Sequence, residues 1–125
     1  MTSACLRRYL KSVATVIQVI PVATPKRTAQ AKDVLETAPG IYTAVFENDS
    51  VRVLKAKMLP GEKVDGYYHP NYLIYVIRPS VIRIVDETAE NLHPCAGDVM
   101  WMEAGYHSCE NVGKAVFEAL LVEVK

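Results

Sequence analysis

From residue 41 to the C-terminus, the chain consists of short runs of β-branched and aromatic residues separated by turn-forming residues. The turns recur about every 8 to 12 residues, which is typical of a β-sandwich or β-barrel. They are formed by Gly, Pro, Asn, Asp and Ser, which suit tight turns. No segment here has the pattern of a long helix. We expect strands at residues 41–46, 51–58, 63–69, 72–78, 80–86, 90–95, 98–102, 106–111 and 115–124.

The size and charge of the chain limit the functions that it can have. Its 125 residues suffice for one domain with its own hydrophobic core and are too few for two. Fourteen basic residues balance 14 acidic ones, so the positive surface that nucleic-acid binding needs is missing. Cys5, Cys95 and Cys109 form no CxxC pair, so neither a zinc knuckle nor a disulfide scaffold follows. We expect one all-β domain that binds no nucleic acid.

Residues 1 to 40 differ from the rest and are interpreted as an N-terminal extension before a domain at residues 41–125. Basic residues precede an apolar run from Ser12 to Ala23, and Ala29-Gln30-Ala31 has the small-x-small form that a signal peptidase accepts. Three interpretations of this extension stay open: an export signal, an amphipathic helix, and a swapped strand.

The apolar run of the extension is well below the roughly 20 residues that a membrane span needs, so we expect no membrane span. The place of the protein in the cell depends on how the extension is interpreted. If residues 1–31 are a cleaved signal, the protein is exported or periplasmic. Otherwise it is cytoplasmic.

Tyr67-Tyr68-His69 is the first candidate for a functional stretch. Residues two apart in a strand point to the same face, so Tyr67 and His69 both project into a barrel if either does. His107, on a later strand, is expected to meet them across the cavity.

From about Ala44 to Lys125 the sequence resembles a small single-domain cupin, a jelly-roll β-barrel of the RmlC-like type. The first cupin motif reads Gly, five residues, His-x-His, three or four residues, Glu, six residues, Gly. In this chain Gly61 opens the motif, Tyr67 stands at the first His and His69 at the second. The remaining positions hold Leu73 or Ile74 in place of Glu and Ser80 or Val81 in place of the last Gly.

The second cupin motif is also altered. It has Gly97, Glu103 in place of Pro, Gly105, His107 one residue early, and Asn111 at the expected distance from that His. The segments at residues 47–54 and 110–113 resemble the two ends of the barrel in small bacterial cupins. Relatives of that type often begin with an export signal.

The resemblance implies a metal site of three His and one Glu, a ligand set that suits Fe, Mn, Ni or Zn. The matched positions reduce these ligands to His69 and His107, with Tyr67 as a further candidate, and they supply no carboxylate. A tyrosine with a pKa of about 10 ionises at neutral pH only beside a strongly acidic ion. We therefore expect a degenerate metal site, with a divalent metal bound weakly or not at all.

Other interpretations of these residues stay open. The two histidines can be buried polar groups paired with tyrosine hydroxyls or backbone, and Tyr67 can be a hydrogen-bond donor in the cavity wall. Cys109 should face the same side as His107 and is either a small buried hydrophobe or a soft, reactive thiol. Glu103 is either solvated or returns a carboxylate to the site.

Two functions follow. The first is a cupin barrel that binds a small molecule in its cavity, without an intact standard metal site. The alternative is a metal-dependent enzyme of the dioxygenase, isomerase or lyase type that uses His69 and His107. Candidate catalytic residues are Tyr67, His69 and His107, which also form an acid/base group that needs no metal, as in epimerase-type cupins. We expect a homodimer in either case, because edge strands need covering.

Overall fold

We describe residues 32–125 of a computed structural model of the chain; the export signal, the extension's helix and the swapped strand fall on residues 1–31, outside the described part. Residues 32–125 form nine strands and one short helix. The helix is α2 (Val34–Thr37). The strands are β1 (Tyr42–Glu47), β2 (Val51–Met58), β3 (Lys63–His69), β4 (Tyr72–Arg78), β5 (Ile82–Val85), β6 (Ala89–Leu92), β7 (Val99–Met102), β8 (Gly105–Asn111) and β9 (Phe117–Val124).

All nine expected strands are present, which confirms the all-β prediction. The strands at 51–58, 63–69 and 72–78 have the predicted limits. The largest difference is in β6, which ends at Leu92 rather than at residue 95, because His93 and Pro94 leave the ladder. Proline lacks the N–H that a ladder bond requires.

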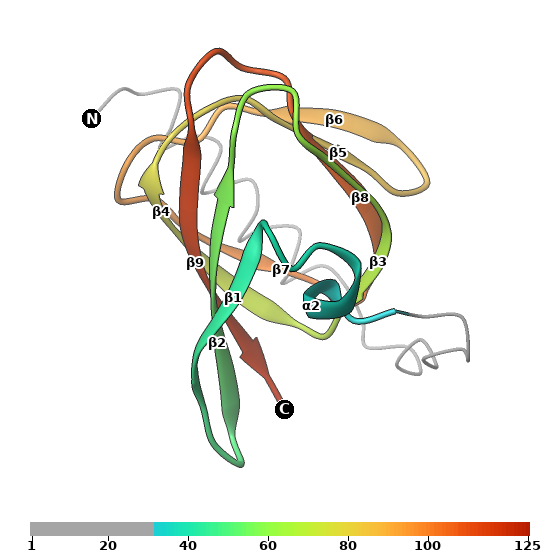
Figure 1. The fold of residues 1–125 in the computed structure, drawn as a ribbon, viewed down its shortest axis with the longest axis vertical. Helices are drawn as coiled ribbons and strands as arrows, with labels where there is room; N and C mark the ends of the chain where they lie inside the picture. Colours follow the sequence, from blue (N-terminus) through green and yellow to red (C-terminus); the bar gives the residue numbers. More distant parts are fainter. Residues whose placement is uncertain (1–31) are drawn as a thin grey trace.

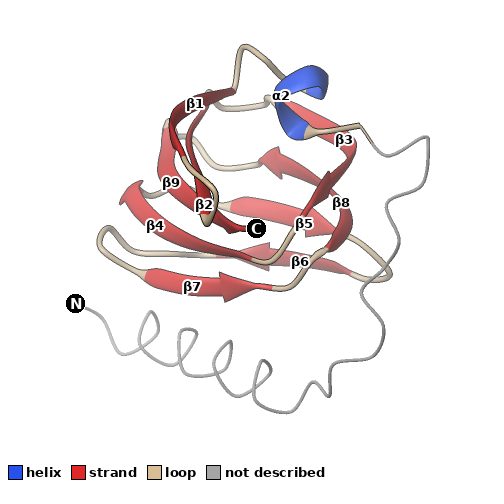
Figure 2. Cartoon of the chain, turned by 90° about the horizontal axis from the view of Figure 1, so that it is seen from below, coloured by secondary structure: helices blue, strands red, loops and turns tan. Residues whose placement is uncertain are grey.

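The strands form two antiparallel sheets that face each other (Figures 1 and 2). The larger sheet has the order β1-β2-β9-β4-β7 and the smaller has the order β3-β8-β5-β6. This arrangement is the predicted jelly roll. The inward-facing side chains of both sheets form a single core, which contains Val34, Tyr42, Leu54, Ala56, Met58, Val64, Tyr67, Tyr72, Val76, Ile82, Met100, Cys109, Phe117, Ala119 and Leu121.

The segment before β1 packs on the barrel. Asp33 caps α2 by accepting a hydrogen bond from the Leu35 N–H at 3.2 Å, and α2 contacts β1 and β3 (Figure 2). Val34 is fully buried. The division of the chain at residue 41 stays a prediction. Within residues 32–125, no helix is long and apolar enough to cross a membrane.

Asn111 holds the end of β8 to the start of β9. Its amide donates to the carbonyls of Met58 and Ala115 at 2.9 and 2.8 Å, and its Oδ1 accepts from the Gly113 N–H at 3.0 Å. The side chain is fully buried and out of reach of bulk water. Its polar atoms therefore need these hydrogen bonds to protein groups.

Candidate functional site

A bulge in β3 decides which of its side chains enter the barrel. The pairing of β3 with β8 shifts register between Val64 and Tyr67, and Gly66 has a φ of +51°. Val64, Tyr67 and His69 are buried, whereas a regular strand would alternate through Val64, Gly66 and Tyr68. The extra residue therefore turns Tyr67 and His69 inward, as predicted for this pair. The Ser108 hydroxyl accepts from the Gly66 N–H at 2.9 Å and fixes the bulge.

Tyr67, His69 and His107 lie together. Tyr67 is directly opposite His107 in the β3–β8 ladder, and their ring centroids are 4.8 Å apart. The His69 ring is 5.0 Å from Tyr67 and 5.6 Å from His107. The three residues were expected to meet across the cavity. They are instead neighbours in one sheet, because β3 and β8 pair with each other.

The residue that reaches these rings from the opposite sheet is Glu123 on β9. Its Oε2 is 2.6 Å from His69 Nδ1, and both residues are almost fully buried. Its other oxygen, Oε1, accepts from Arg52 Nε at 2.7 Å. Arg52 is the direct cross-strand partner of Glu123 in the β2–β9 ladder. A carboxylate is thus shared between a cation and an imidazole inside the barrel.

Asp33, which is half-buried like Arg52, completes this series of polar groups. Arg52 Nη1 and Nη2 donate to its two carboxylate oxygens at 3.0 and 2.6 Å. The hydrogen bond with Asp33 raises the pKa of Arg52 above its ordinary value, and the negative charge of Glu123 adds to that effect. Arg52 therefore stays charged, and Glu123 has an acceptor role toward both of its partners. The series Asp33–Arg52–Glu123–His69 connects the segment before α2 with the interior.

Glu123 sets the hydrogen-bonding roles of His69. A carboxylate only accepts, so Nδ1 of His69 donates and carries a proton. In the neutral ring Nε2 is then a lone-pair acceptor. Nε2 of His69 and Nε2 of His107 are both buried and have no hydrogen-bond partner among residues 32–125. An unpaired buried polar atom costs about 1 to 3 kcal/mol, so these two atoms mark a place suited to a bound group.

The tyrosines around the imidazoles, and His107 itself, are uncharged at neutral pH. Burial raises the pKa values of Tyr42, Tyr67 and Tyr72 well above the ordinary value of a phenol. Burial also lowers the pKa of His107 to about 4, with His69 adding to the effect and the Asp86 charge opposing it. Tyr67 is thus a neutral phenol, as expected of a donor in the cavity wall.

The thiol of Cys109 lies in the same neutral region. It is 3.8 Å from the Tyr42 hydroxyl and 3.9 Å from the Met58 sulfur. Burial raises the pKa of this thiol, so it stays protonated and is a poor nucleophile. Its surroundings are those of a small buried hydrophobe.

The donor set does not fit a standard cupin metal site. Within residues 32–125, no group of three or more His, Cys, Asp or Glu side chains is arranged to hold an ion. His69 and His107 offer two nitrogens, and the Glu123 oxygens already bond to His69 and Arg52. Glu103, considered as a replacement carboxylate, is exposed. The assignment of His69 and His107 as metal ligands stays a prediction.

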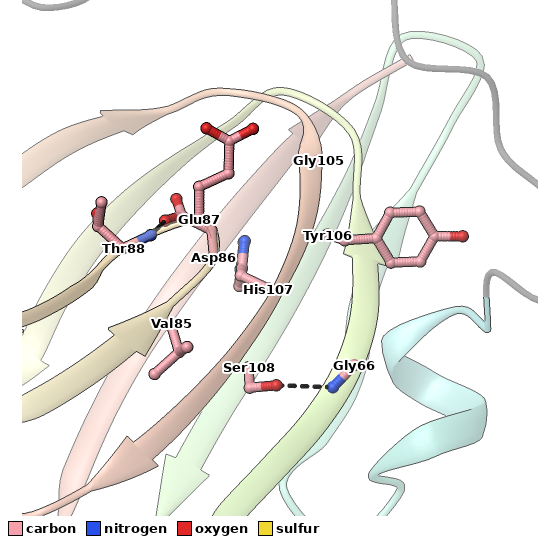
Figure 3. Close-up of a pocket in the computed structure, with 9 residues that line it drawn as sticks. All are labelled: Gly66, Val85, Asp86, Glu87, Thr88, Gly105, Tyr106, His107 and Ser108. Atoms are coloured by element: carbon pink, nitrogen blue, oxygen red, sulfur yellow. Dashed lines mark hydrogen bonds between the residues drawn. The ribbon is translucent and has the colours of Figure 1, made fainter.

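A pocket of about 780 Å³ leads from the surface to His107. The pocket lies between the β5–β6 turn and the part of β8 that is next to the β3 bulge. Figure 3 shows the His107 ring directed toward Asp86 and Glu87. His107 is the buried member of the lining. The lining residues are Gly66, Val85, Asp86, Glu87, Thr88, Gly105, Tyr106, His107 and Ser108.

Sequence reasoning missed Glu123, Arg52 and Tyr42. A signal for Glu123 exists in β9, where Phe117, Ala119, Leu121 and Glu123 share one face and are all buried. Arg52 has the same parity as Leu54, Ala56 and Met58 in β2. A charged residue on the apolar phase of a strand indicates a buried, paired charge. The pairing of the two strands is not visible in the sequence.

Comparison with solved structures shows the same fold at low sequence identity. A cupin domain from Bordetella pertussis matches with a TM-score of 0.64 and 19% identity, over 68% of this chain and 92% of that chain. An RmlC-like cupin family protein from Methanocaldococcus jannaschii matches with a TM-score of 0.56 and 14% identity, over 86% and 92%. A protein with a double-stranded β-helix domain from Klebsiella pneumoniae matches with a TM-score of 0.55 and 20% identity, over 78% of this chain and 90% of that chain. No protein-family model and no curated protein sequence matches the chain.

The depressed pKa of His107 predicts an acid-sensitive fold. Between pH 6.5 and 4, residue 107 binds a proton in the unfolded chain but not in the folded one, so stability falls as pH falls through this window. Lowering the pH from 7.5 to 5 should cost about 2 kcal/mol through this group. Urea unfolding of the wild type and His107→Gln at both pH values measures it. The exposed His93→Gln variant should behave as the wild type, and an unchanged pH dependence in His107→Gln would contradict the assignment.

Removing the shared carboxylate should destabilise the barrel. Glu123→Ala leaves Arg52 and the Nδ1–H of His69 without their common acceptor, which should lower the free energy of unfolding by about 3 to 5 kcal/mol. Chemical denaturation measures the change. Glu118→Ala on the same strand is the matched control, because Glu118 lies 3.7 Å from the exposed Arg78 and should cost below about 1 kcal/mol. Equal losses in the two variants would show that Glu123 has no special role.

Proposed function

Because the chain folds as a cupin domain, we propose that it binds a small molecule in its barrel, without an intact standard metal site. Tyr67, His69 and His107 form the polar floor of this site. The observation that carries the proposal is the pair of buried Nε2 atoms, on His69 and His107, that have no partner among residues 32–125. A ligand that bonds to them removes a cost that the folded protein otherwise bears.

The surroundings suit such a ligand. The pocket beside His107, at about 780 Å³, falls within the range of about 300 to 1,000 Å³ that small-molecule sites occupy. Tyr67 and Tyr72 do not line this pocket; they lie deeper in the barrel, 5.0 and 4.6 Å from the His69 ring, centroid to centroid.

The same three residues have the means to move a proton. Nε2 of His69 is an acceptor whose opposite nitrogen is held by Glu123, and a carboxylate in this position stabilises the imidazolium that forms when Nε2 takes a proton. Tyr67, a neutral phenol beside both imidazoles, is a donor. This acid/base group would act on a bound ligand without a metal ion.

A metal-dependent enzyme of the dioxygenase, isomerase or lyase type is the second candidate. The observation in its favour is the His69–Glu123 hydrogen bond, since metal-binding histidines usually donate their other N–H to a carboxylate or carbonyl. Against it stands the count of two nitrogens, which falls short of the three protein ligands of a typical catalytic site. We derive no reaction step through an ion.

The metal content of the purified protein distinguishes the two candidate functions. Protein purified without chelator should contain less than one Fe, Mn, Ni or Zn per chain by elemental analysis. Titration with Fe(II), Mn(II), Ni(II) and Zn(II) should show micromolar or weaker binding that His69→Ala and His107→Ala leave unchanged. His93→Ala, at an exposed position, controls for adventitious binding. Stoichiometric, tight binding that both site variants abolish would contradict the proposal and favour the metal enzyme.

We also propose that the protein is a homodimer. β1 forms one edge of the larger sheet, and its Val45 and Phe46 are each 54% exposed. A long apolar edge favours pairing with a second chain. Light scattering after size exclusion should give twice the chain mass, and Phe46→Lys should shift it toward the monomer. Val112→Lys, a 43% exposed loop residue, should leave the mass unchanged; a monomeric wild type would refute the dimer.

A further inference from the structure

The pocket that ends at His107 carries an uneven charge. Its rim contains Asp86 and Glu87, both exposed. Oδ1 of Asp86 accepts from the Thr88 N–H at 2.9 Å, so the turn holds this carboxylate in place. Among the described residues that line the pocket, none is Lys or Arg. A ligand that enters here passes a rim of negative charge (Figure 3).

The inner end of the pocket independently indicates a ligand. His107 is only 8% exposed, lines the pocket, and has a buried Nε2 with no partner among residues 32–125. The remaining lining residues are exposed or half-buried. The acidic rim therefore leads to a built polar site. Behind it, the His69 ring is 5.6 Å from the His107 ring, centroid to centroid.

We infer that this site selects a small organic ammonium, a ligand that combines a positive charge with N–H donors, and that it discriminates against carboxylates and phosphates. The inference rests on the proposed small-molecule function and adds the chemical class of the ligand. Two features support it: the charge of the rim, and the buried Nε2 of His107 at the inner end of the pocket, which has no partner among residues 32–125.

The rim acts on the ligand's charge. Asp86 and Glu87 attract a cation and repel an anion, and both effects weaken with salt because these carboxylates are exposed. No cation of the lining offsets them. The Glu123 charge deeper in the barrel is matched by Arg52, which donates to it at 2.7 Å. The rim thus decides the preference between charged ligands.

His107 acts on the ligand's hydrogen bonds. Its Nε2 atom is buried and has no partner among residues 32–125, and the residue lines the pocket. Burial lowers the pKa of His107 to about 4, so the ring is uncharged at neutral pH and does not repel a cation. A neutral imidazole offers one lone pair that accepts a hydrogen bond. An ammonium group supplies an N–H donor for it, and a carboxylate supplies none.

Three small probes with one phenyl ring and different polar groups separate these effects: benzylammonium, benzyl alcohol and benzoate. Calorimetric titration of the full chain at low salt should give the order benzylammonium, benzyl alcohol, benzoate, with the ammonium about tenfold tighter than the alcohol. Raising the salt concentration should reduce this ratio.

Asp86→Asn combined with Glu87→Gln should bring the affinities for the ammonium and the alcohol to within about twofold of each other. The matched control is Asp49→Asn combined with Glu90→Gln, which makes the same charge change outside the pocket and should keep the preference.

The outcomes distinguish the inference from the function on which it rests. Benzoate binding as tightly as benzylammonium, or a preference that survives the Asp86/Glu87 double variant, overturns the ammonium selection and leaves small-molecule binding in place. Failure of all three probes to bind overturns the proposed function together with the inference. The tenfold preference, lost in the rim variant and kept in the control variant, supports both.

Discussion

The carboxylate of Glu123 is the contact on which the arrangement of the interior depends. It lies on β9, in the larger sheet, and bonds to His69 on β3, in the smaller sheet. Arg52 on β2 and, through it, Asp33 before α2 join the same series. A buried charge is tolerated only when it is paired and its hydrogen bonds are made. This polar series therefore joins the two sheets and the segment before β1, alongside the hydrophobic core that the sheets share.

In this series the buried carboxylate of Glu123 already has two partners. A carboxylate that would neutralise a cation in a standard cupin site is here bonded to an arginine and an imidazole. The position of the first motif histidine holds Tyr67, whose pKa is raised by burial, so it brings a neutral phenol and no anion. His107 is neutral as well. Tyr67 and His107 thus bring no formal charge to the interior at neutral pH.

Much of the fold could be predicted because its signals are local. Turn residues and β-branched runs placed all nine strands, and the period of two brought Tyr67 and His69 to one face. That success also depended on the bulge at Gly66, because a regular strand would place Val64, Gly66 and Tyr68 on one face. Glu123 was missed because the motif comparison searched for a carboxylate near Leu73. The contact of Glu123 with Arg52 depends on the pairing of β9 with β2, and the two residues are 71 positions apart. No local sequence pattern indicates a pairing over that distance.

The most direct measurement is a crystal structure, at a resolution that separates water from ligand, of protein purified without chelator or added metal. We expect a non-protein group at hydrogen-bonding distance, about 2.7 to 3.2 Å, from Nε2 of His69 or of His107, with the His69–Glu123 contact intact. Two results would contradict the central claim. One is a pair of Nε2 atoms that both bond to protein groups. The other is an ion with anomalous signal about 2.0 to 2.1 Å from both nitrogens, which would make the site a metal centre.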